Sequence, residues 1–194
     1  MLKAYSPAER TEKMSKNVLI ISTSLRGNKS NSHALALEFE RGAKESGNVT
    51  GLISLQSKTI NFCKGCLACQ KTLKCVIKDD AGEIIEKMKN ADVIVFATPI
   101  YFYGVSGQLK TLLDRTNPIY PADYKFRDIY LLTAAADDAP TTPDGAKTAL
   151  DGWISCFEKA RFAGSVFAGA VNNPGDISEN SALNEAYYLN WNMQ

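Results

Sequence analysis

Apolar positions along the chain follow two patterns that alternate. Short runs of consecutive apolar residues, many of them β-branched, are typical of strands covered on both faces of a sheet. Longer segments in which apolar residues recur every three or four positions are typical of helices packed on one side. The pattern predicts strands at 18–22, 49–55, 93–98, 128–135 and 162–171, and helices at 32–46, 80–90, 106–115, from Thr142-Pro143 onward and at 182–189.

Local signals mark the ends of several of these helices. Gly47 is placed to end the first one, because glycine adopts the left-handed conformation that often follows a helix. Asp80 can cap the start of the second, and Glu83 stands at the spacing of a capping box. Pro143 suits the first helical position. These signals agree with the apolar periodicity and support the predicted boundaries.

Strands that alternate with helices indicate a parallel sheet with helices on both faces. We therefore expect an α/β protein with a three-layer α/β/α architecture and a five-stranded parallel sheet, for which we take the flavodoxin-like order 2-1-3-4-5. Residues 1–14 are polar and charged and are expected to form an N-terminal tail, followed by one domain over 15–194. In such a sheet, ligands bind beyond the carboxyl ends of the strands where the strand order reverses.

Composition excludes several classes of function. The chain has 194 residues, a net charge of +1 and 45% hydrophobic residues, which fits one globular domain and gives no electrostatic reason to expect a nucleic acid or an anionic membrane as partner. The N-terminal segment lacks the apolar stretch of a signal peptide, so we expect a cytoplasmic protein. His33 is the only histidine, which excludes a catalytic histidine pair, and it is expected at the surface or in a helix cap.

The loop after the first strand has the composition of a phosphate site. It is rich in hydroxyl groups, carries positive charge and leads into a helix, whose N-terminus attracts anions. It contains neither a P-loop nor the GxGxxG of dinucleotide-binding folds. An ordinary capped helix start is the alternative. The candidate phosphate-binding residues are Ser24, Arg26, Ser30, Asn31 and Ser32.

The loop after the third strand is suited to a flat aromatic ligand. It holds three aromatic residues in a row, which are costly to leave in water, although a core or dimer-interface role would also cover them. Small residues after the fourth strand would let the backbone approach the same ligand. Together with the phosphate loop, these segments predict FMN as the ligand. The candidate ring-binding residues are Pro99, Ile100, Tyr101, Phe102, Tyr103, Gly104, Ala135 and Ala136.

Four of the five cysteines fall within thirteen residues, in a C-x2-C-x2-C-x5-C run. Such runs can hold an iron–sulfur cluster or zinc, and they also occur as reduced thiols or a labile disulfide. The candidate metal ligands are Cys63, Cys66, Cys69 and Cys75, whereas Cys156 falls in the apolar pattern of a helix and is expected to pack there.

Three segments together resemble the NADPH-dependent FMN reductase superfamily, and in particular its cysteine-containing branch with the iron–sulfur flavoproteins. They are Ser24-x-Arg26 with Ser30-Asn31-Ser32, the cysteine run ending in 75–80, and 98–104 continuing to Asp114-Arg115. The resemblance implies a flavodoxin-like FMN-binding domain, NAD(P)H as the electron donor and a homodimer or homotetramer. It also implies that the four clustered cysteines match the ligands of a 4Fe-4S cluster.

The function expected from these features is an FMN-dependent NAD(P)H oxidoreductase. It would pass electrons from reduced nicotinamide through FMN to a second acceptor, either a small molecule such as a quinone or flavin, or a protein. No catalytic side chain is expected, since the flavin supplies the chemistry. Two alternatives stay open: an iron–sulfur flavoprotein that carries electrons between a cluster and FMN, and a non-catalytic flavin-binding module.

Overall fold

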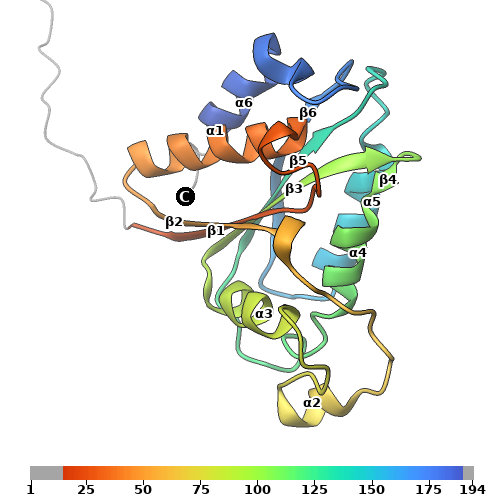
Figure 1. Ribbon diagram of the computed structural model, residues 1–194. Helices are drawn as coiled ribbons and strands as arrows, with labels where there is room; N and C mark the ends of the chain where they lie inside the picture. The colour runs from red at the N-terminus through yellow and green to blue at the C-terminus, as the bar shows by residue number, and fades with distance from the viewer. Residues whose placement is uncertain (1–14, 190–194) are drawn as a thin grey trace, which may run out of the picture.

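A computed structural model describes residues 15–189, so the expected tail 1–14 lies outside the described residues. Its sheet has the predicted parallel strands in the spatial order β2-β1-β3-β5-β6 (Figure 1). Because β4 (Gly104–Val105) only pairs antiparallel with the end of β3, the parallel strands counted along the chain have the predicted order 2-1-3-4-5. The parallel strands are β1 (Asn17–Ser22), β2 (Val49–Ser54), β3 (Val93–Tyr101), β5 (Asp128–Ala134) and β6 (Arg161–Ala168).

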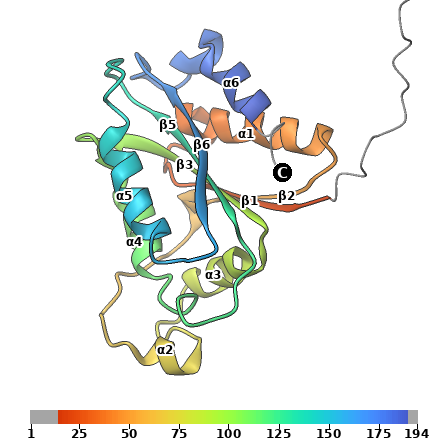
Figure 2. The same ribbon diagram turned by 180° about the vertical axis from the view of Figure 1, so that it is seen from behind.

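Helices cover both faces of the sheet, as Figures 1 and 2 show. One face carries α1 (Asn31–Glu45) and α6 (Ala182–Leu189), and the other carries α3 (Ala81–Asn90), α4 (Gly107–Asp114) and α5 (Asp144–Ile154). Side chains alternate along β1, so that Val18 and Ile20 join the core on one face and Leu19 and Ile21 the core on the other. The predicted three-layer architecture is confirmed.

Two helix starts differ from the prediction. The Asp80 carboxylate makes no cap bond and instead accepts hydrogen bonds from the Thr59 N–H (2.8 Å) and the Lys58 ammonium (3.2 Å). The neighbouring Asp79 accepts the Ala81 N–H at 3.1 Å and takes the role expected of Asp80. Pro143 is the N-cap residue of α5 and not its first helical residue.

Two side chains lie elsewhere than expected. Because α5 ends at Ile154, Cys156 falls beyond the helix and is exposed, so its predicted packing role is wrong. His33 is buried, and only its place in a capped first turn agrees with the sequence. The pattern also missed α2 (Ala68–Thr72), a short helix inside the cysteine run. Over residues 15–189, no helix combines the length and the apolar character needed to cross a membrane.

Candidate functional site

Buried hydroxyl groups fasten the ends of β1 and β3 to the start of α4. Thr23 Oγ1 lies 3.0 Å from Ser106 Oγ and donates to the carbonyl of Ala97 at 3.3 Å. Thr98 Oγ1 donates to Ser106 Oγ at 3.1 Å, while Ser106 caps α4 by accepting the Leu109 N–H. These bonds hold the loops after the two strands next to each other, as the predicted strand order requires.

The start of α1 forms one wall of the site. Ser30 is its N-cap, and its hydroxyl accepts the His33 N–H at 3.3 Å and lies 3.2 Å from the Ser32 hydroxyl. The other N–H groups of a first helical turn have no acceptor within the helix, and they combine with the positive end of the helix dipole. This wall is therefore suited to an anion.

The turn after β6 supplies a second wall that sequence reasoning missed. Arg26 Nη1 donates to the carbonyl of Asn172 at 3.0 Å, and Asn31 Nδ2 donates to the carbonyl of Asn173 at 3.0 Å. Asn31 Oδ1 accepts the Gly175 N–H in return. The Asn-Asn-Pro-Gly turn was visible in the sequence, but nothing local showed that it would meet the phosphate loop.

The aromatic segment forms a tight hairpin between β3 and β4. Tyr101 pairs with Gly104, and Phe102 and Tyr103 between them have φ of 50° and 61°. Positive φ at both central residues is the geometry of a type I′ turn, which is strained for bulky side chains. Phe102 is fully exposed at the tip, and Tyr101 is half exposed. Gly145 of α5 makes room for the hairpin, because a Cβ there would lie 2.2 Å from the Tyr103 carbonyl oxygen.

One cleft collects most of the predicted binding residues; we call it the strand-end cleft. It has a volume of about 160 Å³. The predicted Phe102, Tyr103 and Gly104 are not part of its lining and belong to the hairpin that continues from it. The strand-end cleft is lined by Ser24, Arg26, Ser30, Asn31, Ser32, Pro99, Ile100, Tyr101, Ala134, Ala135, Ala136, Val171 and Asn172.

His33 is buried in the first turn of α1 and does not line this cleft. Burial lowers its pKa below the usual 6.5, although the nearby Glu40 carboxylate opposes the shift. Its Nδ1 has no hydrogen-bond partner among the described residues. The imidazole is therefore a neutral group at neutral pH and adds no positive charge to the phosphate side.

The four clustered cysteines lie in one loop, residues 62–78, which we call the cysteine loop. Cys63 and Cys66 are exposed, Cys75 is half-buried, and Cys69 is buried in α2. Burial, followed by the neighbouring thiols of the loop, raises the pKa of Cys69. Within residues 15–189, no three Cys, His, Asp or Glu side chains converge as a metal site would require. The donor set suits a cluster or zinc, but the described arrangement does not gather it around one point.

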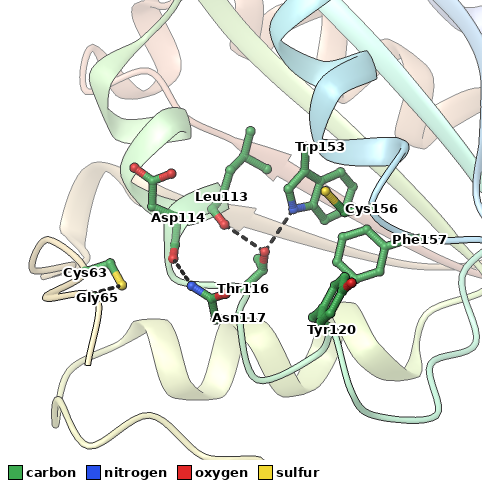
Figure 3. Close-up of a pocket in the computed structure, with 10 residues that line it drawn as sticks. All are labelled: Cys63, Gly65, Leu113, Asp114, Thr116, Asn117, Tyr120, Trp153, Cys156 and Phe157. Atoms are coloured by element: carbon green, nitrogen blue, oxygen red, sulfur yellow. Dashed lines mark hydrogen bonds between the residues drawn. The ribbon is translucent and has the colours of Figure 1, made fainter. Parts of the chain in front are cut away.

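A second hollow, of about 400 Å³, lies between the ends of α4 and α5 and the start of the cysteine loop (Figure 3). Trp153 Nε1 donates to Thr116 Oγ1 at 2.9 Å, so the polar edge of the indole is satisfied within the wall. Cys63 and Cys156 stand on opposite sides of the hollow in Figure 3. Cys63 alone among the predicted site residues lines it, so the hollow is separate from the strand-end cleft.

Comparison with known proteins agrees with this geometry. An iron–sulfur flavoprotein of Methanocaldococcus jannaschii is 46% identical over 89 residues, which are 46% of this chain and 46% of that protein. The chain thus spans about half the length of the curated relatives that it matches. An NAD(P)H:quinone oxidoreductase from Methanothermobacter marburgensis has the same fold, with a TM-score of 0.74 and 18% identity over 93% of this chain and 97% of the other.

An FMN-dependent NADH-azoreductase from Bacillus anthracis, solved in complex with FMN, also shares the fold. Its TM-score is 0.65 and its identity 16%, over 92% of this chain and 99% of the other. The sequence model of the NADPH-dependent FMN reductases matches residues 16–139, a range that includes the hydroxyl-rich loop, the cysteine loop and the aromatic hairpin. This chain therefore belongs to the NADPH-dependent FMN reductase family.

Proposed function

We propose that this protein is an FMN-dependent oxidoreductase that takes electrons from NAD(P)H and passes them to a second acceptor, such as a quinone. The observation that carries the proposal is the strand-end cleft, in which an anion-binding helix start and an aromatic strand end line the same space. FMN has a phosphate at one end and a flat ring at the other. The match of the family over residues 16–139 supports the same cofactor.

The phosphate would bind at the start of α1. Hydroxyl groups of Ser24, Ser30 and Ser32 line the cleft there, and Arg26 is held at its edge by the carbonyl of Asn172. A guanidinium forms charge-assisted hydrogen bonds with phosphate oxygens. Because His33 is neutral, the positive potential among the lining residues comes from Arg26 and from the helix dipole.

The ring would bind between the end of β3 and the end of β5. Pro99, Ile100 and Tyr101 line one side and Ala135 and Ala136 the other, where small side chains let the backbone approach a flat ligand. When bound, FMN supplies the electron-transfer chemistry itself. The protein binds and orients FMN. Because the hairpin beside the cleft is exposed, reactants would reach the bound ring from that side.

Replacing Arg26 tests the phosphate assignment. Arg26→Ala is expected to weaken FMN binding about 10- to 100-fold, which corresponds to the ~1.5–3 kcal/mol of a hydrogen bond to a charged group. Titration of FMN fluorescence measures the affinity. Lys29→Ala is the matched control, because it removes the same charge from the same loop outside the cleft lining. Unchanged affinity in Arg26→Ala would place the phosphate elsewhere.

Reduction of the bound flavin tests the activity. In stopped-flow mixing, NADPH or NADH is expected to bleach the flavin absorbance, and a quinone added afterwards is expected to restore it. If neither nucleotide bleaches the flavin, the reductase proposal is wrong.

The cysteine loop supports a second candidate, an electron carrier that holds an iron–sulfur cluster as well as FMN. Curated relatives are named iron–sulfur flavoproteins, and the four thiols have a spacing that suits thiolate ligation. Iron and sulfide analysis after anaerobic purification decides this point: about four irons per chain would support the carrier, and none would exclude it. The homodimer or homotetramer and the cytoplasmic location stay predictions, and light scattering of the purified protein would measure the first.

A further inference from the structure

Arg115 is a fully buried cation at the end of α4. It is 1% exposed, and its guanidinium donates to both carboxylate oxygens of Asp79, at 2.7 and 2.9 Å. The same group donates to the carbonyl of Asn61 at 2.7 Å and to that of Ile77 at 3.5 Å. Planar, forked donors of this kind bind a carboxylate with a fixed orientation.

The partners of Arg115 lie at the two ends of the cysteine loop. Asn61 precedes the loop, Ile77 is its second-to-last residue, and Asp79 directly follows it. Asp79 Oδ2 also accepts the Asn61 backbone N–H at 2.8 Å and its side-chain amide at 3.1 Å. One buried ion pair therefore joins the entry and the exit of a loop that otherwise extends away from the sheet with α2 (Figures 1 and 2).

Electrostatics keep this pair charged. Burial by itself would raise the pKa of Asp79, but hydrogen bonds from Arg115 and Asn61 outweigh it and lower the pKa to about 2. The Asp79 carboxylate likewise raises the pKa of Arg115, and the nearby Cys75 thiol adds to that shift. Since an apolar pair of similar size often stabilises a fold equally well, the property of this ion pair that matters here is its directional geometry, which ties Arg115 to fixed positions on both sides of the loop.

The other end of α4 is fastened to the segments that carry the strand-end cleft, because its hydroxyl partners directly precede the lining residues Ser24 and Pro99. Its N-cap Ser106 is bonded to Thr23 of the phosphate loop and to Thr98 of β3. The helix has eight residues and a length of about 12 Å. It therefore connects the cleft to the base of the cysteine loop through polar contacts at both ends.

We propose that Arg115 is a positioning residue, which with Asp79 fastens the base of the cysteine loop to the end of α4 and so fixes the four thiols relative to the strand-end cleft. The contacts of Arg115 lie outside the strand-end cleft, so only the identification of that cleft as an FMN site rests on the proposed function. We call the Arg115–Asp79 pair with its contacts the latch. It explains how a segment with one short helix keeps a defined place on the domain.

The buried thiol of Cys69 offers a direct test. Its alkylation by a maleimide requires the loop to open, whereas Cys156 is exposed outside the loop and serves as a reference within the same molecule. Peptide mass spectrometry measures both rates on the full chain without added FMN. The variant Arg115→Met with Asp79→Asn leaves no unpaired buried charge, so it tests the latch without the penalty of a single replacement.

In this double variant, the rate for Cys69 relative to Cys156 is expected to rise about tenfold or more, because alkylation follows the open population. Arg115→Lys keeps the charge without the fork and is expected to recover part of the protection. Lys110→Met is the matched control, since it removes a surface ion pair with Asp114 from the same helix, and its ratio is expected to stay unchanged.

The results separate a latch from a general structural role. A latch predicts a raised Cys69 ratio with an FMN affinity within about twofold of the parent. An unchanged ratio of the two rates in the double variant would overturn the proposal, even if both rates rise equally. Failure of FMN to bind to any variant, including the parent, would contradict the proposed function and leave the alkylation result intact.

Discussion

Replacing Gly145 by alanine is expected to disturb the aromatic hairpin through one atom. Gly145 lies in the first turn of α5, and an added Cβ would stand 2.2 Å from the Tyr103 carbonyl oxygen and 3.2 Å from its carbonyl carbon. Both are backbone atoms, so the contact cannot be relieved by rotating a side chain. Either the hairpin or the helix start must move.

The magnitude follows from two opposing effects. Alanine favours a helix over glycine by about 0.5–1 kcal/mol. Forcing backbone shifts in a packed region costs about 1–3 kcal/mol. We therefore expect Gly145→Ala to lower the free energy of unfolding by about 1–2 kcal/mol, which is a fall in Tm of roughly 2–8 °C for a chain of this size.

Gly152 in the same helix provides the matched control. A Cβ at Gly152 meets no described atom within 4 Å. Gly152→Ala is expected to raise the free energy of unfolding by about 0.5–1 kcal/mol, the full helix preference. Thermal unfolding of the two variants, measured side by side, isolates the contact with Tyr103 from the general effect of alanine.

FMN affinity gives the second readout for the same pair. Because the hairpin continues from Tyr101 in the cleft lining, Gly145→Ala is expected to weaken FMN binding, and Gly152→Ala is expected to leave it unchanged. Equal stability and equal affinity of the two variants would refute the reasoning. In that case the hairpin and α5 could separate freely, and their close approach would not shape the site.

Three further predictions concern single groups. Phe102→Asn is expected to raise the free energy of unfolding by up to about 1 kcal/mol in urea titrations, because asparagine tolerates positive φ and the phenyl ring is fully exposed; a loss of stability would show that the ring packs. Ser106→Ala is expected to cost about 1–3 kcal/mol, since it removes the cap of α4 and a partner of Thr23 and Thr98; a neutral effect would contradict the hydroxyl network. The lowered pKa of Asp79 means that its contribution to stability, about 2 kcal/mol, is present above about pH 4 and is lost as the pH falls towards 2. The urea midpoint should depend less on pH across this range in Asp79→Asn than in the parent protein. An equal dependence on pH would assign the acid sensitivity to other carboxyl groups.

The succession of strands and helices along the chain was predictable because each buried strand has a recognisable local pattern. The runs 18–21 and 93–97 are apolar without interruption, a pattern that is typical of strands buried on both faces. The short α2 gave no such signal, since five residues around a cysteine show no period that could be recognised. Strand β4 has only two residues and was likewise invisible.

The cleft was predictable to the extent that it follows from strand ends. Loops after neighbouring parallel strands must meet at one edge, so the residues around Ser24 and Tyr101 could be paired from the sequence alone. The turn at Phe102 and Tyr103 could not, because a type I′ turn favours asparagine and glycine and these residues favour strands. The approach of α5 through Gly145 depends on packing between segments some forty positions apart and has no local sign.

Burial of Arg115 was the feature that the sequence indicated least. A single arginine at the end of an amphipathic helix normally lies in solvent, and its partner Asp79 stands 36 positions earlier. Buried polar contacts lie at both ends of α4: hydroxyl groups on the side of the cleft and the ion pair on the side of the cysteine loop. Apolar groups of similar volume could fill both places, but their attraction is non-directional, whereas the hydrogen bonds at the two ends of α4 each specify one partner atom. Helix α4 is therefore best understood as the element that sets the cleft and the cysteine loop at a constant separation.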